Sequence, residues 1–308
     1  MSSLVMIFAG NYDCVSSLLN NHPLQKRGWV FQERLMAPRV LHFGNDRIFW
    51  ECNDKMLRET FNPLAVSPFS LPAIVLRSEP EPTPYLDQAT IDYLQIEWLT
   101  LLDYYSTTEL TYPDKDKLMA IGAVAKRFGQ VLPGPYTAGL FLSSYPLGLL
   151  WHNTYGLQYK RKYKDGWNEE ITLDNGRDSV YRAPSWSWAS VDGRTSWPTG
   201  CENPQIFAEV IDVSVKLVNS RNPYGQLLSA EIEVRGRISS IQPLREQEIV
   251  HVPIDKSPER LIGSDELFAL YFFRGKEEDL GEVAYGLVLT KGSAERYRRV
   301  GRTVSTGI

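Results

Sequence analysis

Cysteine is scarce in this chain of 308 residues, which contains 3: Cys14, Cys52 and Cys201. They lie far apart and none belongs to a CxxC pair, which excludes a disulfide framework and argues against a zinc site. Isolated thiols of this kind are typical of a reducing compartment, so we expect a cytoplasmic protein.

Long apolar runs and an excess of positive charge are also absent. No apolar run approaches the roughly 18 residues of a membrane-spanning helix. The formal net charge of −4 at pH 7 supplies no attractive field for nucleic acid. The chain has no P-loop, no GxGxxG dinucleotide motif and no HExxH zinc motif, and its 4 histidines are scattered. We therefore expect no membrane span, no nucleic-acid binding, and no metal or cofactor held by this chain.

Aromatic side chains are what the sequence has in quantity. It contains 8 Trp, 16 Tyr and 12 Phe, together with 19 Pro and 22 Gly. Aromatic residues bury a large area each, whereas proline and glycine interrupt regular elements. This composition predicts a loop-rich body held together by aromatic packing.

The first half of the chain divides into two predicted regions before its helical middle. In residues 1–60, Leu4–Phe8 has the pattern of a short buried strand, and apolar spacing predicts a short helix that ends before Pro38. A hairpin signal follows in residues 39–43 and 47–52. Residues 61–86 contain so many prolines that we expect a connector without regular structure.

Residues 87–200 form the third predicted region, which is helical and aromatic. Apolar periodicity predicts helices over 87–105, 114–128 and 138–150, and residues 183–190 are expected to be an extended, packed strand. This strand would lock the middle region to the C-terminal part through its tryptophans.

The fourth predicted region, residues 201–308, alternates apolar and polar residues in several runs, which predicts antiparallel strands. The basic stretch Lys291–Arg302 is expected to be a solvated strand and turn rather than a phosphate site. The fold class predicted for the whole chain is α+β.

Three stretches are too specific to follow from composition. They are Arg27-Gly28-Trp29-Val30-Phe31-Gln32-Glu33-Arg34-Leu35, Leu110-Thr111-Tyr112-Pro113 with Asp116-Lys117-Leu118, and Tyr181-Arg182-Ala183-Pro184-Ser185-Trp186-Ser187-Trp188-Ala189-Ser190. Together with Gly139-Leu140 and Gly148-Leu149-Leu150-Trp151, they resemble the fungal heterokaryon incompatibility (HET) domain proteins in order and spacing over residues 22–200.

The resemblance implies a role in fungal nonself recognition, in which incompatible alleles trigger programmed cell death after hyphal fusion. Its partners would be other incompatibility proteins or further copies of the same chain. HET domains are similar to TIR domains, which have a flavodoxin-like parallel sheet. Residues 1–60 would then be the C-terminal remnant of such an α/β domain.

The resemblance also implies a candidate site. Many TIR enzymes cleave NAD with a glutamate in a Trp-Cys-x-x-Glu context, and Trp29 and Glu33 have the same spacing. By this resemblance Glu33 is the candidate catalytic carboxylate, Trp29 packs beside the substrate, and Arg34 attracts its phosphates. The residues themselves leave other interpretations open. Glu33 and Arg34 as a buried pair would fix the helix against the sheet, Trp29 fits a core position, and His42 fits a structural histidine.

Two segments typical of the family are missing. They are an opening Tyr-x-x-Leu-Ser-Tyr-x-Trp-Gly segment and a later Trp-Ile-Asp-x-Ile-Cys-Ile-Asp-Gln segment. We therefore expect a truncated chain without a complete NAD-cleaving site, so that NAD is a substrate only of complete relatives. The alternatives are an NAD hydrolase whose missing strands come from a partner, and a non-enzymatic interaction module in which the β-rich residues 200–308 bind a partner.

Overall fold

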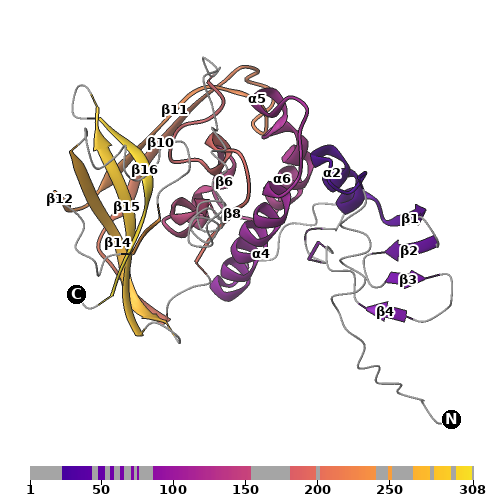
Figure 1. Ribbon diagram of the computed structural model, residues 1–308, viewed down its shortest axis with the longest axis horizontal. Helices are drawn as coiled ribbons and strands as arrows, with labels where there is room; N and C mark the ends of the chain where they lie inside the picture. The colour runs from indigo at the N-terminus through magenta and orange to yellow at the C-terminus, as the bar shows by residue number, and fades with distance from the viewer. Residues whose placement is uncertain are drawn as a thin grey trace, which may run out of the picture.

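The computed structural model describes residues 23–43, 48–52, 56–58, 63–65, 71–72, 75, 86–153, 181–198, 202–240, 249–251, 266–277, 281–292 and 296–306. Helices and antiparallel sheets are both present in these residues, which confirms a mixed α+β architecture (Figure 1). The strand expected at Leu4–Phe8 lies outside the described residues.

The N-terminal part consists of one helix and a small sheet. The elements are α2 (Gly28–Met36), β1 (Arg39–Phe43), β2 (Ile48–Cys52), β3 (Met56–Arg58) and β4 (Pro63–Ala65). The predicted hairpin is confirmed as β1 and β2, and the strands follow the order β1-β2-β3-β4. The expectation that residues 61–86 contain no regular element is wrong at β4, which pairs with β3 at the sheet edge, where a strand tolerates Pro63. All pairs between named strands in the described part are antiparallel, so the flavodoxin-like remnant stays a prediction.

The middle region is built around the long helix α4 (Gln88–Ser106), which confirms the helix predicted over 87–105. Asp87 caps its start by accepting a hydrogen bond of 2.9 Å from the Thr90 amide. Its inner face carries Leu94, Trp98, Leu101, Leu102 and Tyr105, all buried.

The single helix predicted over 114–128 is wrong. The chain forms α5 (Pro113–Asp116), the 3₁₀ turn η1 (Met119–Ile121) and α6 (Gly122–Phe128). Side chains are buried at most positions from Lys117 to Phe128, which is more than one face of a straight helix can bury. The break turns both faces of this segment into the core.

The helix predicted over 138–150 is also wrong. Its place is taken by β5 (Tyr136–Thr137), β6 (Leu140–Phe141), η2 (Leu142–Ser144) and η3 (Leu147–Leu150). Ala138 and Gly139 have positive φ angles of 49° and 95°, which reverse the chain between β5 and β6 and are incompatible with a right-handed helix. The region ends in β7 (His152–Asn153), η4 (Trp188–Ser190) and β8 (Thr195–Ser196).

The C-terminal part is β-rich, as predicted. Its strands are β9 (Glu202–Ile206), β10 (Glu209–Leu217), β11 (Leu227–Arg235), β12 (Ile238–Ser240), β13 (Ile249–His251), β14 (Leu267–Glu277), β15 (Gly281–Lys291) and β16 (Tyr297–Thr306). The main sheet has the order β12-β14-β15-β16-β13, with β9 also paired to β14. The expectation of a solvated strand at Lys291–Arg302 is wrong for Arg299 and Arg302, which are 4% and 6% exposed because they face the core.

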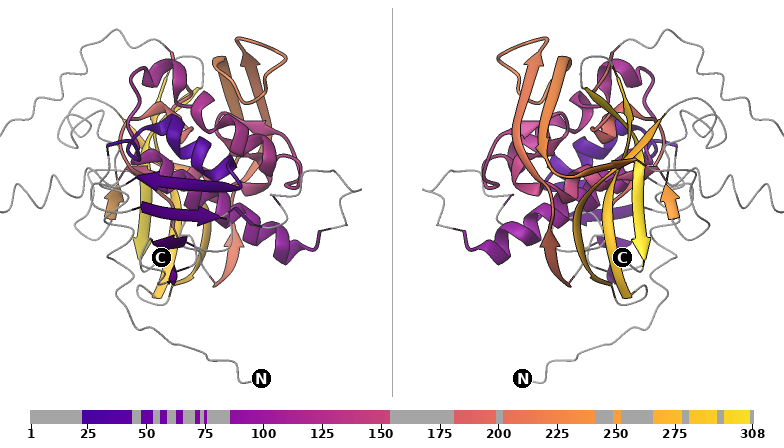
Figure 2. Two further views of the ribbon diagram at one scale, coloured as in Figure 1. Left: turned by 90° about the vertical axis from the view of Figure 1, so that its right-hand side faces the viewer. Right: turned by 90° about the vertical axis from the view of Figure 1, so that its left-hand side faces the viewer.

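The middle region separates the two ends of the described chain. In Figure 1 it lies between the main C-terminal sheet and the N-terminal elements, and the left view of Figure 2 shows α2, β1 and β2 facing the viewer on the side away from that sheet. The hairpin β10–β11 runs from the sheet to α5, where Gln226 donates a hydrogen bond of 3.1 Å to the Lys115 carbonyl. The helical core is therefore covered from several sides by parts distant in sequence.

Candidate functional site

Glu33, the candidate catalytic carboxylate, lies on the solvent side of α2. The helix turns Gly28, Phe31 and Leu35 toward the core, and Glu33 is exposed. Its side chain has no hydrogen bond or ion pair with other residues of the described part. In these residues the carboxylate has neither the enclosure nor the neighbours that would hold a substrate beside it.

Trp29 is 37% exposed, so the prediction of a core tryptophan is wrong. Its indole Nε1 donates to Asp116 Oδ2 over 3.3 Å, which ties α2 to α5. The inner position is taken by Gly28, where a Cβ atom would lie 2.6 Å from the side chain of Leu110. Gln32 completes this junction, because its side-chain oxygen accepts a bond of 2.6 Å from the Ala123 amide.

Arg34 belongs to a buried polar ring. Its guanidinium donates to both carboxylate oxygens of Glu51, over 2.7 and 2.9 Å, and to Gln25 Oε1 over 3.2 Å. The Arg34 and Glu51 side chains are 7% and 6% exposed. His42 closes the ring through Nε2, 2.7 Å from Glu51, and Nδ1, 3.3 Å from Gln25. The interpretation of Glu33 and Arg34 as a buried pair is wrong, because Glu33 is exposed and the acid that pairs with Arg34 is Glu51. This use of Arg34 leaves it turned away from any ligand on the Glu33 side.

The ring confirms the structural interpretation of His42 and shows which residues sequence reasoning missed. Glu51 and Gln25 were not singled out, although Glu51 stands between Trp50 and Cys52 in an apolar strand. A lone acid in such a strand indicates a buried partner of opposite charge.

The aromatic segment 183–190 is packed but is not a strand, so that part of the prediction is wrong. It forms turns and the short η4, and its two tryptophans, Trp186 and Trp188, are both buried. The Gly139 carbonyl accepts indole hydrogen bonds from Trp98 over 3.3 Å and from Trp188 over 3.0 Å. Ser187 adds a bond of 2.6 Å to the Ala138 carbonyl.

The predicted contact between the middle region and the C-terminal sheet is confirmed. It is made mainly by Trp151 and Arg299 rather than by the tryptophans of segment 183–190. Trp151 donates through Nε1 to the Trp186 carbonyl over 2.9 Å. The guanidinium carbon of Arg299 on β16 lies 3.5 Å from the Trp151 ring centroid. The Arg299 amide also donates to Ser185 Oγ over 3.2 Å.

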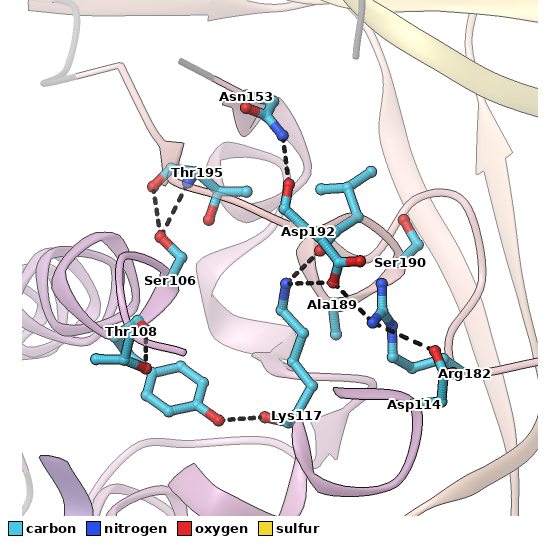
Figure 3. A network of polar contacts seen from close by, with 12 residues as sticks. Ser106, Thr108, Asp114, Lys117, Asn153, Arg182, Ala189, Ser190, Asp192 and Thr195 are labelled. Carbon is cyan, nitrogen blue, oxygen red and sulfur yellow. Dashed lines mark hydrogen bonds and ion pairs between the residues drawn. The ribbon is translucent and has the colours of Figure 1, made fainter. Parts of the chain in front are cut away.

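A cluster of charges joins the second and third sequence stretches (Figure 3). We call Lys117, Arg182, Asp192 and Asp114 the Lys117 cluster. Lys117 Nζ donates to the Val191 carbonyl and lies 3.9 Å from Asp192 Oδ1. Arg182 Nη1 lies 2.8 Å from the same Asp192 oxygen and 3.5 Å from Asp114 Oδ1.

The surroundings of Lys117 lower the pKa of its amine. Its side chain is 6% exposed, and its Nζ lies 5.6 Å from the centroid of the Trp188 ring. Burial and, after it, the positive charge of Arg182 lower the pKa of Lys117 to about 7, and Asp192 opposes this shift. Burial also raises the pKa of Tyr105, whose hydroxyl donates to the Lys117 carbonyl over 2.8 Å.

The Lys117 cluster was missed by sequence reasoning as a site. Lys117 and Arg182 belong to stretches that were singled out, but nothing in their spacing places them together. The amine is committed to a carbonyl of its own chain, so the cluster acts as a joint between α5 and residues 181–192 rather than as an open binding site.

No group of three or more His, Cys, Asp or Glu side chains in the described residues is placed to hold a metal ion. No helix in the same part of the chain is long and apolar enough to cross a membrane. Comparison with models of protein families, with curated proteins and with solved structures finds no match to this chain.

Proposed function

We propose that this chain is a HET-type incompatibility protein that acts in fungal nonself recognition and the cell death that follows it. The observation that carries the proposal is the convergence of the stretches on which the resemblance rests. The first meets the second through Trp29 and Asp116. The second meets the third where Lys117 Nζ lies 5.6 Å from the centroid of the Trp188 ring, and the Gly139 carbonyl accepts a hydrogen bond from Trp188. Short matches that arose by chance would have no reason to be joined in this way, so the convergence supports one shared signature.

We further propose that the described residues do not cleave NAD themselves. Loss of nicotinamide develops positive charge on the ribose, and a carboxylate stabilises it best in a site that excludes water. Glu33 faces solvent, while Arg34 and Trp29 are hydrogen-bonded to Glu51 and Asp116. These positions support a role in recognition, by binding other incompatibility proteins or a second copy of the chain.

The enzymatic part is tested by incubating the purified protein with NAD and measuring released nicotinamide. We compare the unchanged chain with Glu33→Gln and with Glu233→Gln, which alters an exposed carboxylate on β11. All three are expected to match buffer alone. Turnover that Glu33→Gln abolishes and Glu233→Gln keeps would instead establish the NAD hydrolase alternative.

The recognition part is tested by expressing the chain in a filamentous fungus and fusing it with a panel of genetically different strains. Staining for membrane integrity should reveal death of fusion cells in some pairings, and Glu33→Gln should leave that death unchanged. Survival of the fusion cells in every pairing would refute the proposed function.

A further inference from the structure

Two arginines lie on the same inner face of β16. In the sheet register Arg299 stands opposite Leu289 and Arg302 opposite Leu287, and both leucines belong to the hydrophobic core. A register shift between these pairs brings the two arginines, three positions apart, onto the same face. Two positive charges therefore point from the C-terminal sheet to the side that carries these core leucines.

The contacts of Arg299 hold it in place. Its guanidinium stacks on the Trp151 ring at 3.5 Å and donates to the Trp151 carbonyl. A planar guanidinium held against an aromatic face keeps its orientation and its charge. Arg299 is therefore a fixed positive charge on the same face of β16 as Arg302.

Arg302 lacks comparable contacts. Its guanidinium carbon lies 5.6 Å from the Tyr285 ring centroid, and its buried Nε has no hydrogen-bond partner. Within the residues that the structure describes, Arg302 makes no side-chain hydrogen bond or ion pair, although a guanidinium has five N–H donors. The carboxylate whose field reaches it, Glu277, accepts a hydrogen bond from the Tyr285 hydroxyl.

Such a group is costly unless something compensates it. A buried charge is normally paired and hydrogen-bonded, because the interior solvates it poorly. Burial lowers the pKa of Arg302 to about 10, with Tyr285 and Glu277 opposing the shift, so it still carries its proton at neutral pH. The position thus combines unused donors, a retained positive charge and a second positive charge on the same strand face.

We propose that Arg302, supported by the charge of Arg299, binds the phosphate group of a small ligand at the inner face of β16. Guanidinium donors match phosphate oxygens in pairs, and two neighbouring positive charges suit a dianion better than a single carboxylate. The phosphate comes either from free orthophosphate or from a nucleotide. Its binding is independent of Glu33, which lies on α2 at the other end of the described chain.

Equilibrium dialysis of the whole protein against radiolabelled orthophosphate tests the proposal, with ADP as a competitor in a second arm. We expect saturable binding of one phosphate per chain, and Arg302→Met should weaken it at least tenfold. Arg296→Met removes a 73% exposed arginine near the start of the same strand and should leave the affinity unchanged. Competition by ADP at concentrations well below those of orthophosphate would assign the site to a nucleotide.

Two further variants separate a binding role from a packing role. Arg302→Lys keeps the charge but loses the paired donors, so it should bind phosphate less tightly while folding normally. Glu277→Gln removes the nearby negative charge and should tighten binding. The proposal would be overturned if the unchanged chain showed no saturable binding of phosphate. It would also be overturned if Arg302→Met bound phosphate with equal affinity while its unfolding temperature showed that the variant was folded.

Discussion

The buried amine of Lys117 predicts an unusual dependence of stability on pH. In the folded chain burial lowers its pKa from 10.5 to about 7, whereas the unfolded chain exposes the amine to water. Between these two pKa values the unfolded state therefore holds more protons than the folded state. Stability must rise with pH across this window, and below pH 7 the cost of burying the ammonium is present in full.

The size of the effect follows from the two pKa values. One pKa unit corresponds to about 1.4 kcal/mol, and Lys117 is half-titrated at the start of the window. Raising the pH from 7 to 9 should therefore increase the free energy of unfolding by about 2 kcal/mol. The assay is urea unfolding followed by tryptophan fluorescence at several values from pH 6 to pH 9.

A matched pair of variants isolates the contribution of Lys117. Lys117→Met replaces the amine with an apolar side chain of similar length, and Lys115→Met changes an exposed lysine two residues away. The rise with pH should disappear in Lys117→Met and persist in Lys115→Met, because other titrating groups are common to both. Parallel curves for the unchanged chain and Lys117→Met would refute the reasoning.

Three other substitutions test the joints of the fold by urea unfolding. Gly139→Ala should destabilise by more than about 2 kcal/mol, because the residue has a φ of 95° and its Cβ would lie 2.5 Å from Trp188 Nε1; an unchanged unfolding midpoint would contradict this packing. Gly28→Ala should cost about 1–3 kcal/mol because of its clash with Leu110, and a neutral result would show that α2 can move away. Arg34→Met should cost about 3 kcal/mol, because it leaves the buried Glu51 carboxylate with His42 as its remaining partner in the ring, and a cost below about 1 kcal/mol would mean that this acid reaches water.

The local sequence pattern was sufficient to predict a helix or strand that buries only one of its faces. The hairpin β1–β2 and the helix α4 match their predictions because alternation in the one and helical periodicity in the other agree with burial. The segments 114–128 and 138–150 carry apolar residues on every side, and their breaks are imposed by tertiary contacts. The turn at Gly139 is one of these, since it is packed by Trp188, 49 positions away.

The candidate site shows the same division. The sequence pattern correctly predicted that Glu33 and Arg34 lie on a helix, which is α2. Their environments did not follow, because the partner of Arg34 depends on how α2 crosses the hairpin that carries Glu51. The exposure of Trp29 likewise depends on Leu110 occupying the inner side at Gly28.

The shared carbonyl of Gly139 has a consequence for the growing polypeptide on the ribosome. Its two indole donors, Trp98 and Trp188, are translated 90 residues apart, so at about 5–20 residues per second the first waits several seconds for the second. The stacking of Arg299 on Trp151 comes later still, because Arg299 is translated 111 residues after Trp188. Until then the aromatic side chains already synthesised, such as Trp98, are not buried by their final partners, and a chaperone could bind them.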